Sequence, residues 1–379
     1  MRFDLQSLSD LGFHVDLLAL PMGDDLPIPN VRRIRPWNPL RIQHVPIGPS
    51  LRKASFAPIL LAEALRLVAK NRYDALHCVE DAGLIGALVK RITGRPFVYE
   101  RHSDPASYRH GPLRNLVLAG YSQLEAWALR YADAVVTGPA LVPQTRALAP
   151  AQRVHPIASI PSSFMEADDE AAAEIARGLK RSADEVLVTY AGSYAAYQGI
   201  ELMFEAMLPV FRNDTNVRFV IIGGSPGEIA KKKEWLADRQ VESRVSFIGM
   251  VHPDEIPSHL AAADILISPR LAGKNSPIKL LDYFKAGRAI VATDNHANRA
   301  YLDESNSILT EQTAENLADG ITRLVRDPGL RERLAGAGRK AIDEVYNYDE
   351  FKRRLGICYA ELWPANGPAP SDTRRRDIP

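Results

Sequence analysis

Two hydrophobic periods alternate along most of the chain. Short apolar runs, of the length of buried strands, are separated by longer segments in which apolar residues recur every three or four positions. Strands separated by helices predict βαβ units, and therefore a parallel sheet covered on both faces. In the N-terminal part the apolar runs lie at 14–20, 74–79, 96–102 and 134–138, with helix-period segments such as 60–70 and 113–131 between them.

The alternation pauses once, at residues 160–169 (IPSSFMEADD), and then begins again. This segment predicts an interdomain linker, because it combines a proline and two serines with an acidic run. Three helices are predicted near the end of the chain, the last over residues 348–363. The apolar runs of the second series lie at 186–193, 217–224, 245–250, 265–268 and 290–293.

We therefore predict an α/β domain over residues 1–160 and a second one over 161–347. The helix 348–363 is expected to pack back on the first domain, and residues 364–379, rich in Pro, Asp and Arg, are expected to be disordered. A doubly wound domain normally opens with a strand and a glycine-rich turn. This chain begins instead in an amphipathic helix over residues 1–10, so either the first strand is missing or the start of the gene is placed too late.

Composition narrows the class of protein. With 379 residues, of which 46% are hydrophobic and 25% charged, the chain is typical of globular proteins and long enough for two domains. A formal net charge of +1 gives no indication that the partner is a nucleic acid. Cys78 and Cys358 do not suggest a metal or redox pair, and no apolar run approaches the roughly 20 residues that span a bilayer. We therefore expect a cytoplasmic protein.

The most informative segment is 268–294, SPRLAGKNSPIKLLDYFKAGRAIVATD. After a strand and a polar loop, a helix is expected with Ser276 as N-cap and Pro277 as its first residue. Lys279 then takes the third helical position, where the helix dipole disfavours a cation unless an anion is bound. Asp282 follows on the same helix face and could accept hydrogen bonds from vicinal hydroxyls, as on a ribose. The alternative is an ordinary solvated ion pair of Lys279 with Asp282.

A second candidate element is the loop in 190–201, YAGSYAAYQGIE, where Gly192 and Gly199 allow a ligand to approach the backbone closely. A plain turn between strand and helix is the alternative. The segment 222–228, IGGSPGE, is not a GxGxxG motif and lacks the acidic residue that binds the ribose of NAD. An NAD-dependent dehydrogenase is therefore disfavoured.

Together with 244–251 (RVSFIGMV) and the closing helical region 315–351, these segments resemble glycosyltransferase family 4, the retaining GT-B enzymes. The resemblance implies an α/β fold of two Rossmann-like, doubly wound parallel-sheet domains that face a cleft. It assigns the acceptor to the first domain and the nucleotide-sugar donor to the second. The implied reaction moves a sugar from a UDP- or GDP-sugar to an acceptor such as a lipid-linked or polysaccharide precursor, with no cofactor and no metal.

The resemblance also implies roles for individual residues. His102 would face the donor sugar, and Lys279, which matches a lysine common in the subgroup, would bind the donor diphosphate; these two are the predicted catalytic residues. Asp282 stands at the second glutamate of the family's E-x7-E motif, which holds the donor ribose. The other predicted donor-binding residues are Gly192, Ser193, Gln198 and Gly199 on one loop, Val251 beside the base, and Lys274, Asn275 and Ser276 on a second loop.

Three positions depart from the family pattern. Lys274 replaces the first glutamate of E-x7-E, while Ser193 and Gln198 stand where many members carry Arg and Lys. One sugar contact and two phosphate-binding cations are thereby lost, although Lys279, with Arg270 or Lys274, could restore the positive charge. Two other functions stay open for this reason: a sugar-nucleotide epimerase on the same architecture, and a degenerate protein that binds nucleotide-sugar without turnover.

One segment departs from the neutral charge balance. Residues 26–62 contain no acidic residue, and their basic residues with an aromatic suit an anionic membrane surface. The hypothesis is a lipid-linked or membrane-proximal acceptor, with peripheral contact at the inner face of the membrane; the alternative is a flexible basic loop. The residues concerned are Arg32, Arg33, Arg35, Trp37, Arg41, Arg52 and Lys53.

Overall fold

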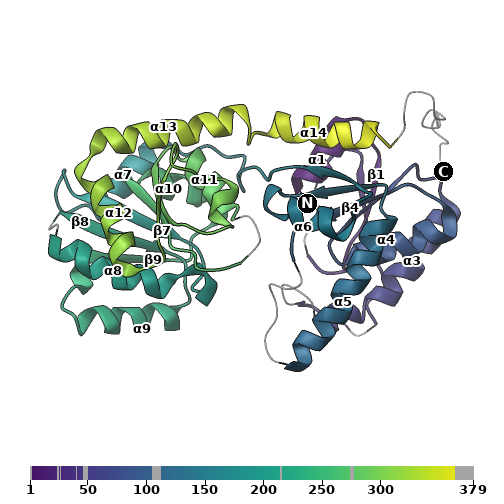
Figure 1. Ribbon diagram of the computed structural model, residues 1–379, viewed down its shortest axis with the longest axis horizontal. Coiled ribbons are helices and arrows are strands. Elements are labelled where there is room, and N and C mark those ends of the chain that lie inside the picture. The colour runs from purple at the N-terminus through teal and green to yellow at the C-terminus, as the bar shows by residue number, and fades with distance from the viewer. Residues whose placement is uncertain are drawn as a thin grey trace. The chain divides into compact units, whose positions relative to one another are not determined.

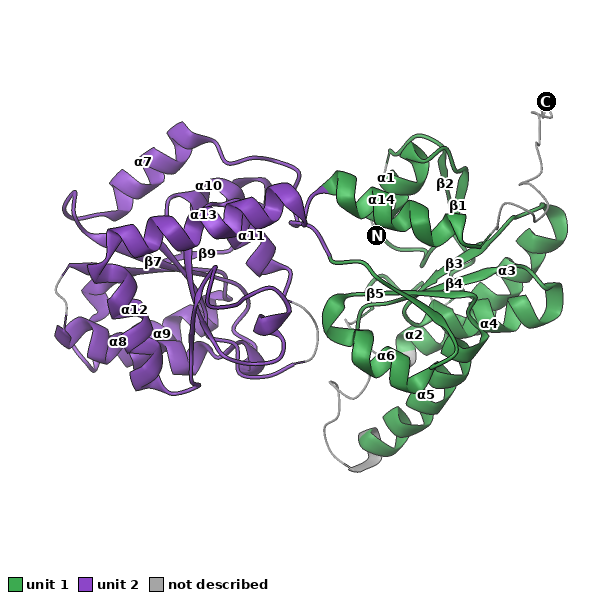
Figure 2. Ribbon diagram, turned by 45° about the horizontal axis from the view of Figure 1, so that its top comes forward, with its two compact units in different colours: residues 1–158, 348–379 green, residues 159–347 purple. Residues whose placement is uncertain are grey.

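The structure is a computed structural model and describes residues 2–23, 25, 27–39, 41–45, 50–104, 112–213, 216–273 and 277–362. The chain divides into two compact units, drawn with their element labels in Figure 1 and coloured separately in Figure 2. Unit 1 comprises residues 1–158 and 348–379, and unit 2 comprises residues 159–347. The predicted disordered tail, 364–379, lies outside the described residues.

Unit 2 is built on a six-stranded, all-parallel sheet of order β12-β11-β10-β7-β8-β9. The strands are β7 (Val186–Ala191), β8 (Val217–Ile222), β9 (Val245–Gly249), β10 (Ile265–Ser268), β11 (Ala289–Thr293) and β12 (Ile308–Thr310). The helices are α7 (Asp169–Leu179), α8 (Ile200–Asn213), α9 (Pro226–Ala237), α10 (Ile256–Ala261), α11 (Lys279–Lys285), α12 (Ala314–Arg326) and α13 (Pro328–Glu344).

Helices cover both faces of this sheet. Val188 and Tyr190 of β7 point into a buried cluster with residues of α8 and α12, whereas Leu187 packs with α7 on the opposite face. This alternation follows from the two-residue period of a strand, and burial of both faces explains the continuous apolar runs in the sequence. The five strands predicted for this part of the chain are confirmed; β12 has only three residues and was not predicted.

Unit 1 contains two parallel sheets, β1-β2 and β3-β4-β5-β6. The strands are β1 (Val15–Leu18), β2 (Val31–Ile34), β3 (Leu76–Val79), β4 (Phe97–Arg101), β5 (Ala134–Thr137) and β6 (Arg153–Pro156). The helices are α1 (Arg2–Asp10), α2 (Leu51–Ala54), α3 (Ala57–Lys70), α4 (Ala82–Thr93), α5 (Pro112–Tyr131), α6 (Val142–Leu148) and α14 (Tyr348–Ala360).

The helix α14 belongs to the core of unit 1, although it is the last element of the described chain. Its residues Leu355, Cys358 and Tyr359 are buried in one cluster with Leu8 of α1 and Val98 of β4. Cys358 is therefore a small buried apolar residue, and it forms no disulfide. None of the helices in the described ranges is long and apolar enough to cross a bilayer.

The predicted start of α11 is wrong. The helix begins at Lys279, so this residue is the first helical residue rather than the third, and Pro277 precedes the helix. The amide N–H of Leu280 donates to Pro277 O (3.0 Å), which forms a tight turn before the regular helix. The expected N-cap, Ser276, lies outside the described residues.

Candidate functional site

The strand order of unit 2 reverses at β7. The chain adds β8 and then β9 on one side of this strand, and later adds β10, β11 and β12 on its other side. In open α/β sheets ligands bind at such a reversal, outside the carboxyl ends of the strands. The two loops at this point follow β7 and β10, and they are the two loops that the sequence singled out as candidate elements.

These two loops contact each other directly. The amide of Leu271 donates to the carbonyl oxygen of Tyr197 over 2.9 Å. Gly199 has a left-handed backbone (φ 71°), and a Cβ atom at this position would lie only 1.8 Å from the carbonyl oxygen of Pro269. Glycine is therefore the one residue that fits here, and its use brings the loop after β7 against the end of β10.

Lys279 lies at this junction. Its Nζ donates to Gln198 Oε1 (3.1 Å) and lies 4.5 Å from the centre of the Tyr190 ring. Gly192 leaves room on the same side, since a Cβ atom there would be 3.5 Å from Nζ. The residues that the sequence assigned to the two loops, Gly192, Gln198, Gly199 and Lys279, are thus brought together.

A second cation lies close to Lys279. Arg270 is only 6% exposed, stacks over Tyr197 at 5.3 Å from the ring centre, and donates from Nε to Ala272 O (2.8 Å). Burial and the charge of Arg270 lower the pKa of Lys279 to about 7. Burial also lowers the pKa of Arg270. Among the described residues, the side-chain partners of Lys279 and Arg270 are uncharged, so this junction favours an anionic ligand.

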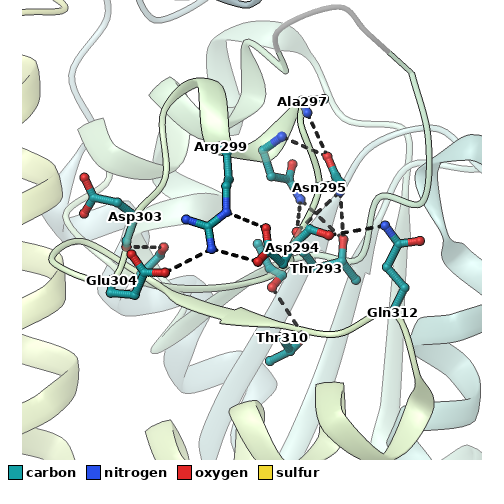
Figure 3. Close-up of polar contacts among 12 residues, drawn as sticks. Thr293, Asp294, Asn295, Ala297, Arg299, Asp303, Glu304, Thr310 and Gln312 are labelled. Carbon is teal, nitrogen blue, oxygen red and sulfur yellow. Dashed lines mark hydrogen bonds and ion pairs between the residues drawn. The ribbon is translucent and has the colours of Figure 1, made fainter.

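The neighbouring arginine in the loop after β11 is different. Figure 3 shows Arg299 between two carboxylates: it donates to both oxygens of Asp294 (2.6 and 2.7 Å) and to Glu304 (3.0 Å). Asn295 belongs to the same loop, and its side-chain amide donates to the carbonyl oxygen of Arg270 over 2.7 Å. The charge of Arg299 is therefore neutralised by carboxylates of its own loop. The Arg270 guanidinium is instead bonded to a main-chain carbonyl oxygen, which does not neutralise its charge.

Asp282 lies one turn after Lys279 and is engaged by the linker before α7. Ser162 donates its backbone N–H to Oδ1 (2.7 Å) and its hydroxyl to Oδ2 (2.9 Å). Burial raises the pKa of the Asp282 carboxyl, although the two hydrogen bonds oppose this shift. The carboxylate is thus held by two donors in the arrangement that a vicinal diol would offer.

Asp282 also lines a cavity of about 190 Å³ within unit 2. Val251, which follows β9, lines the same cavity, so two predicted donor-binding residues meet there. The other walls are mainly apolar, with Ser162, Ser163 and Lys285 as polar residues. The cavity combines an apolar wall with one carboxylate, as a site for a flat base and its sugar requires.

The remaining predicted residues lie elsewhere or cannot be placed. Ser193 is exposed, and its carbonyl oxygen accepts a hydrogen bond from Tyr190 (2.7 Å). Lys274, Asn275 and Ser276 lie outside the described residues. His102 belongs to unit 1, where it follows β4; its Nε2 lies 2.9 Å from Glu100 Oε1. Among the residues that the structure describes, no group of His, Cys, Asp and Glu is arranged to hold a metal ion.

Sequence reasoning missed Tyr190 and Ser162, and it named Arg270 as a source of positive charge but not as a cation stacked on Tyr197. Tyr190 reads as one more apolar position of a strand, and only the register places its ring under Lys279. Ser162 is 120 residues from Asp282 in the sequence, so no local pattern relates them. The position of Arg270 in the segment 268–294, shortly before α11, was the sequence signal that this cation lies near Lys279.

The basic segment of unit 1 is largely neutralised by its own surroundings. Arg32 forms a bidentate pair with Asp16 (2.9 and 2.6 Å), and Arg35 donates to Asp25 over 2.7 Å. Trp37 is 75% exposed. The free positive charge of this segment is therefore smaller than its sequence suggests.

Comparison with known proteins gives two family matches. Residues 5–138 match the family described as "Glycosyltransferase Family 4", and residues 185–327 match "Glycosyl transferases group 1". The first lies in unit 1 and the second in unit 2, so both halves of the chain are assigned.

Individual relatives agree with this assignment. Over 286 residues the chain is 29% identical to alpha-D-kanosaminyltransferase of Streptomyces kanamyceticus, which covers 73% of each chain. It is 24% identical over 304 residues to phosphatidyl-myo-inositol mannosyltransferase of Mycobacterium leprae, covering 79% of this chain and 76% of the relative. The solved structure of Anabaena Alr3699/HepE in complex with UDP has a TM-score of 0.69 at 18% identity and covers 88% of this chain and 86% of that one. The chain is thus a glycosyltransferase with a GT-B fold and belongs to glycosyltransferase family 4.

Proposed function

We propose that the chain transfers a sugar from a nucleoside-diphosphate sugar to an acceptor with retention of anomeric configuration, and that unit 2 holds the nucleotide. The observation that carries this proposal is the pair Lys279 and Arg270, two cations without a carboxylate partner among the described residues. Lys279 lies one helical turn before Asp282 on α11, and Arg270 lies in the loop after β10, at the reversal of the strand order. A diphosphate next to a ribose complements this order, because the cations match the phosphates and the carboxylate accepts from the ribose hydroxyls.

The diphosphate would lie against Lys279 and Arg270. As the glycosidic bond breaks, negative charge grows on the departing diphosphate, and fixed cations at that position stabilise the transition state more than the ground state. Gln198 and Ser193 are uncharged, so the positive charge comes from the loop after β10. Gln198 accepts a hydrogen bond from Lys279 and thereby directs its ammonium group toward the loop after β7. No cofactor or metal is required by this proposal.

The nucleoside would occupy the cavity that Val251 and Asp282 line. The ribose hydroxyls would donate to the Asp282 carboxylate and share or replace the two donors of Ser162. The base would lie against the apolar wall beside Val251. A uridine or a guanosine diphosphate sugar is the proposed donor class; the solved relative in complex with UDP supports the first.

The proposed acceptor is a lipid-linked or polysaccharide precursor, reached by a cytoplasmic enzyme with peripheral contact at the inner membrane face. Two observations support it: the name of one relative specifies phosphatidyl-myo-inositol, and Trp37 is 75% exposed within the basic segment. The ion pairs of Arg32 and Arg35 reduce the charge that this segment can offer to anionic lipids.

Calorimetric titration with UDP and with GDP tests the donor site. Lys279→Ala should weaken binding of the preferred nucleotide by about 10- to 100-fold, the range for hydrogen bonds to charged groups. Lys340→Ala is the matched control, because that side chain is 72% exposed on α13 and should leave affinity unchanged. Equal affinity in the Lys279→Ala variant would remove the phosphate role.

Incubation with UDP-glucose, UDP-N-acetylglucosamine and GDP-mannose tests the reaction class. Release of free nucleoside diphosphate is expected for a transferase, through slow hydrolysis or transfer to added glycan. Conversion of the donor into its isomer would indicate an epimerase instead. Tight binding without any turnover would indicate a protein that only binds nucleotide-sugar.

A further inference from the structure

Four side chains of unit 1 form a continuous hydrogen-bonded row that ends at His102. Tyr359 Oη lies 2.7 Å from His77 Nδ1, and His77 Nε2 lies 2.7 Å from Glu100 Oε2. The other oxygen of Glu100 lies 2.9 Å from His102 Nε2. The row therefore joins α14, β3 and β4 and reaches the carboxyl end of the sheet.

The fold explains why these residues meet. In the parallel pair β3–β4, His77 is the register partner of Val98, and Glu100 and His102 follow Val98 at intervals of two residues. The side chains of His77, Val98, Glu100 and His102 therefore lie on one face of the sheet. That face carries the cluster of Val98 with Leu355 and Tyr359, whereas Phe97 and Tyr99 belong to the cluster on the opposite face.

The row has one consistent arrangement of protons. Glu100 is 3% exposed, and although burial raises the pKa of its carboxyl, hydrogen bonds from His102 and His77 hold that pKa well below its usual range. An ionised carboxylate only accepts, so both imidazoles donate from Nε2. His77 Nδ1 then accepts from the Tyr359 hydroxyl. His102 is left with Nδ1 as the nitrogen not bound to Glu100, on a side chain that is 48% exposed.

Among the described residues, the charged groups that act on the pKa of His102 are all negative. Glu100 faces its ring, Glu80 accepts a hydrogen bond from its backbone N–H, and Asp4 of α1 adds a weaker attraction. Burial lowers the pKa of His102, but the bond to Glu100 and these carboxylates raise it overall. A protonated His102 would present an N–H donor at Nδ1.

We infer that Glu100, His77 and Tyr359 are positioning residues, which fix the ring of His102 so that Nε2 points at Glu100 and Nδ1 is the nitrogen presented to substrate. Below the raised pKa of His102 this nitrogen donates to a sugar hydroxyl, and above that pKa it accepts from one. The inference rests on the proposed function only in assuming that His102 meets a substrate. It also gives a role to the last described helix, through Tyr359.

NMR of the free, full-length protein with ¹⁵N,¹³C-labelled histidine tests the inference without any substrate. His102→Asn identifies the signals of His102. In the wild-type protein we expect Nε2 to stay protonated across the titration and the pKa of His102 to lie above its ordinary value. Titration of His102 at an ordinary pKa, or as a mixture of tautomers, would overturn the inference even if no other variant folds.

Two variants separate the members of the row. Glu100→Gln should lower the pKa of His102 by at least about one pH unit, as expected when an adjacent opposite charge is removed; Glu63→Gln, whose carboxylate pairs with Arg66 on α3, should not. Tyr359→Phe keeps the ring but removes the donor to His77 Nδ1, so the ¹⁵N shift of this nitrogen should change to that of an acceptor without a hydrogen bond, while Nε2 stays protonated against Glu100. An unchanged His102 in Glu100→Gln, or an unchanged His77 in Tyr359→Phe, contradicts the assignment. Absence of sugar transfer would count against the proposed function and leave these spectra as they are.

Discussion

Ser162 supplies two hydrogen-bond donors to the two carboxylate oxygens of Asp282, at 2.7 and 2.9 Å. The donors are a backbone N–H and a hydroxyl, so they form the same pattern as the two hydroxyls of a ribose. In the proposed site, linker and nucleotide would therefore compete for one carboxylate, or share it. The competition can be measured because one of the two donors is a removable side chain.

Ser162→Ala should tighten binding of the nucleoside diphosphate by about two- to tenfold. The variant frees one carboxylate oxygen, and the competing hydrogen bond that is removed is worth about 0.5–1.5 kcal/mol. Calorimetric titration measures the change. Ser182→Ala is the control, since the Ser182 hydroxyl donates to Asn216 Oδ1 (3.2 Å) and does not line the cavity. Weaker binding in Ser162→Ala would mean that Ser162 orients the carboxylate rather than competing with the ligand.

Nucleotide affinity should depend on pH through Lys279. Its pKa is lowered to about 7 in the free protein, and a bound diphosphate favours the charged form and raises that pKa again. Above pH 7 binding must therefore take up a proton, so affinity should fall as pH rises from 7 to 9, by at most about tenfold per pH unit. Calorimetric titrations in two buffers of different ionisation enthalpy measure the number of protons taken up on binding. Lys279→Met should remove the proton uptake; a slope that persists in this variant would assign it to another group.

Gly199→Ala should destabilise unit 2 by about 2 kcal/mol or more. A left-handed backbone costs about 1–2 kcal/mol for an L-residue, and the new Cβ would meet the carbonyl oxygen of Pro269. Urea denaturation measures the loss. Gly336→Ala is the matched control, because nothing lies within 4 Å of its added Cβ in α13, and alanine should stabilise that helix by about 0.5–1 kcal/mol. If the two variants have equal stability, the close packing of the two loops is not required.

Trp37→Ala should weaken binding to anionic lipid vesicles by about fivefold or more, since an exposed indole can insert at a membrane interface. Sedimentation with phosphatidylglycerol vesicles and with neutral phosphatidylcholine vesicles measures it. Met250→Ala, at an 85% exposed apolar residue of unit 2, is the control. Equal binding of the wild-type protein to both kinds of vesicle would remove the anionic-membrane hypothesis.

The strands with two buried faces could be predicted from the sequence, because they form continuous apolar runs. The run Ala289–Thr293 is an example, buried along its whole length. β2 could not be predicted in this way, because Arg32 and Arg33 interrupt its apolar pattern. Their side chains form hydrogen bonds with Asp16 and Met22, which precede the strand. β6 is an edge strand that ends in Pro156 and reads as a turn.

The candidate site was predictable only in part, for a related reason. The loops after β7 and β10 could be identified by their glycines and their helix starts. That they are neighbours depends on the strand order, which no local pattern encodes. The pairing of Ser162 with Asp282 and the row from Tyr359 to His102 link residues far apart in the chain, so only the folded structure relates them.

The place of α14 in the core of unit 1 has a consequence for synthesis of the protein. Translation proceeds from the N-terminus, so every strand of both units has left the ribosome before Leu355, Cys358 and Tyr359 are made. Unit 2 can then complete its core while the earlier unit still exposes an apolar sheet face. Nascent chains arrested before residue 348 should accordingly be bound by chaperones at residues of unit 1. Chains extended through α14 should no longer be bound there.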